Sequence, residues 1–427
     1  MDAEQGLPLS EQPGPALVPS TSRRRFADVS RAARWGAPGV SQIVSSLGNV
    51  ALIVIAARVM SVQRFGDFSL AYAGVLLVSQ LVRVALGEAS MLWAASSDDI
   101  PDAAPMVLGA ALAVTPTIGV VAGGLTLFIS GSVSFALATG FGVCLVSLAD
   151  TTRYALLARG RVRRSVLFDI IWTFSEFGGL LVLWWRGTFS PALLLLVWVL
   201  SAILAVTSAV GAVRPGGPFQ SLRAVARNPH WWRLAVNEAI ITGSSYALLA
   251  ILGITGGTGY VGAVRAALLP YLWVQLAISA IWLVVLSRRP TAVQLRCFSL
   301  LMAEILLAAI LVTAATVKLI PDSVGLRVLG ERWEQVSRLG VYAALAYAAL
   351  AVAELLVLQL KAVADTGAVL NARLFGALVT ACVSIAIIVS PSPTIALIGV
   401  IAGHVAVAAV ALQRRRKSRL RTGAAVV

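Results

Sequence analysis

The chain has 427 residues, of which 59% are hydrophobic and only 12% charged, and its net charge is +15. A soluble domain carries roughly 25% charged residues, so a chain this apolar could not cover itself with a polar surface in water. The positive charge suits the cytoplasmic loops of a membrane protein, which collect Lys and Arg, and it therefore does not indicate nucleic acid as a partner.

Twelve apolar stretches are long enough to cross a bilayer. A hydrocarbon core of about 30 Å is crossed by about 20 helical residues, and in lipid each segment must satisfy its own backbone groups. We therefore predict an all-α polytopic membrane protein. Its spans are 37–59, 68–94, 105–129, 133–157, 165–185 and 189–213 in the first half, and 234–254, 259–287, 292–317, 338–360, 366–389 and 393–412 in the second. The third and fourth spans are separated only by a weak Ser-Gly break at 130–132.

Basic residues gather in every second loop. If the N-terminus is cytoplasmic, 25 of the 34 lysines and arginines fall inside and 7 outside, and Arg83 and Arg265 lie within spans. Since cytoplasmic loops are enriched in Lys and Arg, this pattern predicts that both termini are cytoplasmic and that the number of spans is even.

A Pro- and Gly-rich basic segment divides the chain into two sets of six spans. We expect a disordered basic N-tail at 1–36, an N-lobe at 37–213, a cytoplasmic linker at 214–233, a C-lobe at 234–412 and a basic C-tail at 413–427. The segments 64–68 and 258–260, which open the second and eighth spans, are weakly similar. Internal repeats of this kind are common in transporters, where substrate binds between the repeats.

Arg83 and Arg265 are the basic residues that topology leaves unexplained. A charge at the bilayer centre costs about 2.5–3.5 kcal/mol on insertion scales, so it usually faces a cavity or a partner. Arg265 lies among small residues and five positions before Pro270, which favours a bend. It either binds an anion or snorkels to the outer headgroups. Arg83 lies deeper and either binds an anion or forms a structural ion pair.

Other polar residues in the spans are weaker candidates. Glu176 and Glu304 are possible proton or ion relays, whereas Glu354, nearer the cytoplasmic edge, suits a solvated or paired role. The uncharged cavity candidates are Asn49, Asn237 and Gln275. The chain has no phosphate-binding loop and no HExxH motif, so we expect neither ATP hydrolysis, nor a metal, nor a cofactor.

Several segments, in order along the chain, resemble a known family. The run Ser41-Gln42-Ile43-Val44-Ser45-Ser46-Leu47-Gly48-Asn49, then Ala57-Arg58 and the segment 65–71, resembles the opening of bacterial polysaccharide flippases. These belong to the superfamily of multidrug/oligosaccharidyl-lipid/polysaccharide exporters. The segment 259–267 with Pro270 is similar to the start of their second lobe. Leu329-Gly330-Glu331-Arg332-Trp333 resembles the Leu-Gly-x-x-Trp sequence before their tenth helix.

The resemblance implies two six-helix lobes around a central cavity, working by alternating access in the bacterial cytoplasmic membrane. It implies a non-enzymatic flippase whose cargo is a lipid-diphosphate-linked oligosaccharide or polysaccharide precursor. Arg83 and Arg265 match the basic residues that line the cavity in that family. The implied partners are the lipid-linked glycan, membrane lipids, glycosyltransferases and a glycan polymerase. Many members have fourteen helices, whereas twelve are predicted here.

Two alternatives stay open at this point. The first is a proton- or sodium-coupled exporter of drugs or other small molecules. The second is a membrane glycan polymerase or ligase, which generally needs a sizeable outer loop. The largest outer loop predicted here runs from Lys318 to Arg338 and carries acids and arginines, but it is short for such an enzyme.

Overall fold

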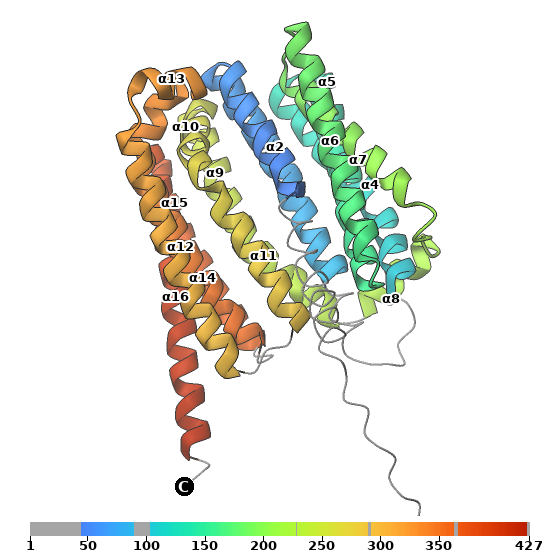
Figure 1. Ribbon diagram of the computed structural model, residues 1–427, viewed down its shortest axis with the longest axis vertical. Helices are drawn as coiled ribbons and strands as arrows, with labels where there is room; N and C mark the ends of the chain where they lie inside the picture. The colour runs from blue at the N-terminus through green and yellow to red at the C-terminus, as the bar shows by residue number, and fades with distance from the viewer. Residues whose placement is uncertain (1–43, 89–102, 228, 289–291, 363–365, 425–427) are drawn as a thin grey trace, which may run out of the picture.

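The computed structural model describes residues 44–88, 103–227, 229–288, 292–362 and 366–424 (Figure 1). Across these residues the regular structure is helical and contains no strand. The predicted all-α polytopic fold is therefore confirmed, and the chain is a multi-pass membrane protein. The N-tail predicted at 1–36 lies outside the described residues.

Helices follow the predicted spans closely. In the first half they are Val44–Val59, α2 (Val62–Val82), the π-helix η1 (Arg83–Glu88), α4 (Ala103–Ser130), α5 (Val133–Ala158), α6 (Val162–Arg186), α7 (Pro191–Ala209) and the short α8 (Pro218–Arg227). In the second half they are α9 (Pro229–Gly256), α10 (Thr258–Leu268), the 3-10 turn η2 (Leu269–Tyr271), α11 (Leu272–Arg288), α12 (Ala292–Leu319), α13 (Asp322–Leu329), α14 (Arg332–Ala362), α15 (Thr366–Val389) and α16 (Pro393–Ala424).

Within the described residues, 11 segments are long and apolar enough to cross a membrane. They correspond to the second to twelfth predicted spans, and α10, η2 and α11 share one of them, Thr258–Trp282. The first predicted span corresponds to the shorter apolar helix Val44–Val59. Figure 1 shows α13 at the opposite end of the molecule from α8. This placement is expected when successive spans cross one membrane in alternating directions.

The weak break between the third and fourth spans is a real helix boundary. Gly131 has a φ of 65°, which glycine adopts without steric cost, so the chain can reverse within a few residues. The Ser132 side chain then accepts a hydrogen bond from the Phe135 backbone N–H at 3.3 Å and caps α5.

Two segments predicted as loops contain helices. The linker predicted at 214–233 contains α8, and α9 already begins at Pro229. The outer loop contains α13, and α14 begins at Arg332. Proline suggested a loop in the linker, but proline is also favoured at the first position of a helix, where Pro218 and Pro229 stand. The buried Ser221 packs α8 against Gly109 of α4.

The two halves of the chain meet where α2 crosses α10. A Cβ on Gly66 of α2 would collide with the backbone carbonyl of Thr258, at the start of α10. A Cβ on Gly262 would lie 3.0 Å from the Val62 carbonyl oxygen. Small residues let membrane helices approach this closely. One buried apolar cluster consequently combines Phe65 of α2 with Ala266 of α10, and Figure 1 shows α2 beside α9 and α10.

The end of the molecule where α13 lies has a buried arginine. Arg332, at the start of α14, is 1% exposed and donates a hydrogen bond to the Met60 carbonyl. Its guanidinium lies 5.8 Å from the centre of the Phe65 ring. The neighbouring Trp333 donates from Nε1 to Asp322 of α13 at 2.8 Å. These contacts join α13 and α14 to the start of α2 and close this end of the interface between the halves.

We expect Gly66→Ala to destabilise the protein by about 1–3 kcal/mol, because the added methyl group forces α2 and α10 apart. Gly74→Ala is the matched control, since a Cβ there meets nothing within 4 Å. Alanine is favoured over glycine inside a helix, so the control variant should be as stable as the parent or more so. Thermal unfolding in detergent measures both. Equal melting temperatures for the two variants would contradict the close crossing.

Candidate functional site

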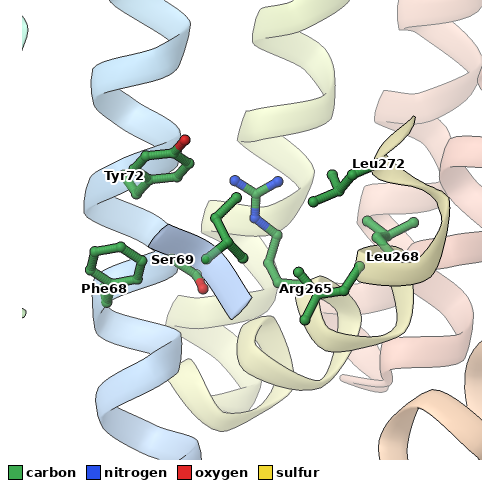
Figure 2. A pocket seen from close by; sticks show the side chains of 8 residues that line it. Phe68, Ser69, Tyr72, Arg265, Leu268 and Leu272 are labelled. Atoms are coloured by element: carbon green, nitrogen blue, oxygen red, sulfur yellow. The ribbon is translucent and has the colours of Figure 1, made fainter. Parts of the chain in front are cut away.

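A pocket lies between the two halves, next to the α2–α10 crossing (Figure 2). Most of its lining is apolar, with three polar side chains, and both halves contribute. It is lined by Ile53 of the first helix, Phe68, Ser69 and Tyr72 of α2, and Arg265, Leu268, Leu269 and Leu272 of α10, η2 and α11. In its lining the pocket resembles a ligand site, where a few polar groups converge on an apolar surface.

Arg265 supplies the positive charge of this pocket. In Figure 2 its side chain leaves α10 and extends between Tyr72 and Leu272. The residue is half-buried, and its Nη2 is fully buried without a hydrogen-bond partner among the described residues. No carboxylate in the described part of the chain forms an ion pair with it. A partly desolvated cation that forms no ion pair favours an anion in the pocket.

Tyrosines from both halves lie near the Arg265 guanidinium. Tyr246 of α9 is close enough to interact with it directly, and Tyr72 and Tyr347 are within range of its charge. Tyr72 belongs to the first half of the chain, whereas Tyr246 and Tyr347 belong to the second. A phenol can both donate and accept a hydrogen bond. Phenol groups that can bind the oxygens of a polar ligand therefore lie near the arginine.

Arg83 and Arg265 lie at or close to departures from regular α-helix. Arg83 opens the π-helix η1, and Arg265 stands four residues before the 3-10 turn that contains Pro270. Proline cannot donate a backbone hydrogen bond, which explains the second irregularity and agrees with the bend expected there. Short π-helical segments are frequent at functional sites. Arg83 does not line the pocket.

Glu176 and Asn49 lie on the first-half side of the pocket. Asn49 accepts a hydrogen bond from the Tyr72 hydroxyl at 3.2 Å. Glu176 of α6 is 1% exposed, packs against Gly48, and its Oε1 has no hydrogen-bond partner among the described residues. The structure thus brings these two predicted residues together behind the tyrosine that faces Arg265.

The remaining predicted residues lie elsewhere. Asn237 of α9 is buried, and its Oδ1 has no hydrogen-bond partner among the described residues. Gln275 of α11 is exposed. Glu304 is exposed on α12, surrounded by exposed apolar side chains such as Leu301 and Ile305. Glu176 and Glu304 are therefore in different environments, although the sequence presents them as similar.

Two other arginines in the spans are paired with carboxylates of their own half. Arg153 of α5 lies 3.7 Å from Asp169 of α6 and donates to Ser45 at 2.9 Å. Arg373 of α15 binds both carboxylate oxygens of Glu354 on α14, at 2.7 and 2.9 Å. Arg153 and Arg373, counted with the cytoplasmic loops from sequence, are thus buried inside helices. These pairs hold each half together and leave the pocket unaffected.

Sequence reasoning missed the tyrosines. Tyr72 and Tyr246 lie in apolar spans, where an aromatic side chain usually packs in the core, so only their place beside Arg265 distinguishes them. It also missed Asp169, which is fully buried. Over the described residues, no group of three or more His, Cys, Asp or Glu side chains is placed to hold a metal ion.

No family model matches the chain, and no curated protein matches it in sequence. Solved structures do match it. A multidrug resistance MATE family transporter of the MOP superfamily, in an outward-facing conformation, aligns with a TM-score of 0.65 at 14% identity and covers 91% of this chain and 95% of that chain. MATE in the straight conformation gives a TM-score of 0.63 at 14% identity over 92% and 96%.

A MOP superfamily transporter from Pyrococcus furiosus, whose binding pocket is described as having reverse polarity, gives a TM-score of 0.63 at 14% identity over 91% and 96%. These proteins are transporters, not enzymes. At this identity the likeness shows the fold: the chain has the fold of MATE transporters of the MOP superfamily. This fold agrees with the two-lobe transporter fold that the sequence resemblance implies.

Replacing Arg373 with Met should destabilise the protein by about 3–5 kcal/mol, because Glu354 is left buried without its partner. Arg373→Met combined with Glu354→Leu should recover much of the loss, since no unpaired charge remains. Arg338→Met, at an exposed arginine on the same helix as Glu354, serves as the control. Melting temperatures in detergent distinguish these outcomes. A double variant no more stable than Arg373→Met would show that the ion pair is not the source of the effect.

Proposed function

We propose that the chain is an alternating-access transporter that flips a lipid-diphosphate-linked oligosaccharide or polysaccharide precursor across the cytoplasmic membrane. The observation that carries the proposal is Arg265, whose buried Nη2 has no hydrogen-bond partner in the described structure and which lacks a carboxylate counter-charge there. It stands in the pocket between the two halves, where a ligand would be exposed to either side in turn.

A diphosphate suits this environment. Guanidinium groups bind phosphate oxygens through short, charge-assisted hydrogen bonds, and these are stronger in a low-dielectric site than in water. The neighbouring hydroxyls of Tyr72 and Ser69 can bind further oxygens of the diphosphate or of the first sugar. A polyprenyl tail would stay in the lipid, so only the polar head needs this shielded path.

Topology and partners belong to the same proposal. The positive-inside distribution of arginines supports cytoplasmic N- and C-termini, with α8 on the cytoplasmic side and α13 outside. The enzymes that build the lipid-linked glycan and the polymerase that uses it are the expected partners. The site would need no cofactor, since flipping breaks no bond in the cargo.

The exporter alternative is favoured by one observation, the structural likeness to a multidrug resistance MATE transporter. An unpaired Arg265 in the pocket argues against cationic drugs, because like charges repel strongly in a low dielectric. An anionic or neutral small molecule would fit. The enzyme alternative has less support, since Arg332 and Asp322 of the outer segment already bind Met60 and Trp333.

Arg265→Gln should slow flipping of a fluorescent lipid-diphosphate oligosaccharide in proteoliposomes by about 10- to 100-fold. Losing a hydrogen bond to a charged group costs about 1.5–3 kcal/mol, which corresponds to that factor. Arg265→Lys keeps the positive charge but loses the planar guanidinium, which can bind two phosphate oxygens at once, so its flipping rate should be intermediate. Arg186→Gln, at an exposed arginine, is the control.

Two results would overturn this assignment. One is an Arg265→Gln variant that inserts normally and flips at the parental rate. The other is that the parent protein transports a small solute and Arg265→Gln does not, while neither of the two proteins flips the lipid-linked glycan. The second result would favour the exporter.

For energy coupling, we expect Glu176→Gln to remove the stimulation of flipping by a proton gradient, because Glu176 is buried beside the Tyr72–Asn49 pair that borders the pocket. Glu304→Gln is the matched substitution at a residue exposed on α12, and it should keep the stimulation. Flipping rates with and without the gradient measure both. The reverse pattern would assign coupling to Glu304 instead.

A further inference from the structure

Two arginines converge on one carbonyl oxygen at the end of the molecule where α8 lies. Arg159 and Arg161 flank the turn between α5 and α6, and the Nη1 of each donates to the carbonyl of Ala212, at 3.0 and 2.7 Å. Gly160, with a φ of 67°, lets the turn reverse tightly enough for both side chains to reach the same atom. Both nitrogens lie within 3.0 Å of one oxygen, so the two charged groups are held close together.

Ala212 accepts hydrogen bonds from both guanidinium groups, which keeps two positive charges close together. Arg161 is exposed and forms no ion pair with a carboxylate among the described residues. A guanidinium has five N–H donors, of which Arg161 uses one on Ala212. The arrangement therefore holds like charges together and still presents donors to a ligand that carries negative charge. Arg163 and Arg164, both exposed, add to the positive potential at the start of α6.

The place of the arginine pair at the ends of three helices indicates which kind of anion it would meet. Arg159 directly follows the α5 span, Arg161 directly precedes the α6 span, and Ala212 lies three residues after α7 ends at Ala209. Three membrane-spanning helices thus end around the arginines, at the depth where hydrocarbon gives way to headgroups. Lipid phosphates lie at this depth, and basic pockets between helix ends are known to bind anionic headgroups.

The two helices that follow the arginines in sequence offer exposed apolar side chains to acyl chains. Leu167 and Phe174, seven residues apart and so on one face of α6, are exposed. Leu200 and Leu204, four residues apart on the neighbouring α7, are exposed as well. A lipid whose phosphate binds the arginine pair could lay its chains along these side chains, whereas a soluble phosphate would have no use for them.

We propose that Arg159 and Arg161 form a binding site for the phosphate of an anionic phospholipid, in the leaflet at the α8 end of the molecule. The site is separate from the Arg265 pocket and does not depend on which cargo the protein carries. The bound lipid would tie the α5–α6 turn to the end of α7, since its phosphate would bridge the two arginines that already share Ala212.

The test uses the full chain in neutral detergent and measures the melting temperature after adding phosphatidylglycerol or phosphatidylcholine with the same acyl chains. A ligand that binds only the folded state raises the melting temperature. We expect phosphatidylglycerol to raise it by at least about 3 °C more than phosphatidylcholine. The difference should fall by half or more in Arg161→Gln and vanish in Arg159→Gln/Arg161→Gln. Should the double variant fail to fold, the single variant at the exposed Arg161 decides.

Arg223→Gln/Arg227→Gln is the control, because it removes two exposed arginines from α8, at the same end of the molecule, without touching the pair. This variant should keep the full phosphatidylglycerol effect. An equal loss in both double variants would mean that general positive charge attracts the lipid, and the proposed site would be wrong. Inorganic phosphate is the third arm, and a shift as large as that of phosphatidylglycerol would overturn the assignment to a lipid.

Discussion

The close crossing of α2 and α10 is the contact on which the site depends. Gly66 and Gly262 allow the two helices to touch backbone to backbone near the α13 end, and this contact joins the first half of the chain to the second. Arg265 follows Gly262 by about one turn, so the crossing determines where its guanidinium emerges. It emerges opposite Tyr72, which lies almost two turns beyond Gly66 on α2. A wider crossing would separate the arginine from the tyrosine and open the pocket.

Charge pairing then separates structural arginines from the one in the pocket. Arg153 is paired with Asp169 within the first half, and Arg373 with Glu354 within the second. Arg332 is buried at the α13 end and is held by the Met60 carbonyl and the Phe65 ring. These groups have their partners in the protein. Arg265 stands between the halves without a carboxylate partner in the described structure, and a ligand is therefore the natural source of the missing charge.

Sequence patterns predicted the helices well because hydrophobic length and loop charge report directly on a bilayer. They failed where a residue type has two uses. Proline at 218 and 229 indicated a loop but begins helices, and Arg373 was counted with a loop but pairs inside a span. Glu176 and Glu304 both lie within apolar spans, yet one is buried beside Asn49 and the other is exposed on α12. Only packing between distant helices makes these distinctions, and one sequence does not contain them.

Photo-cross-linking from the pocket tests the central claim most directly. A photoreactive amino acid at Leu268, which lines the pocket beside Arg265, should capture a radiolabelled lipid-diphosphate oligosaccharide in membranes, and excess unlabelled lipid should compete. The same group at Leu311, exposed on α12, should give little competable product. Equal capture at both positions, or none at Leu268, would contradict the account, because the diphosphate would then not pass between the two halves at Arg265.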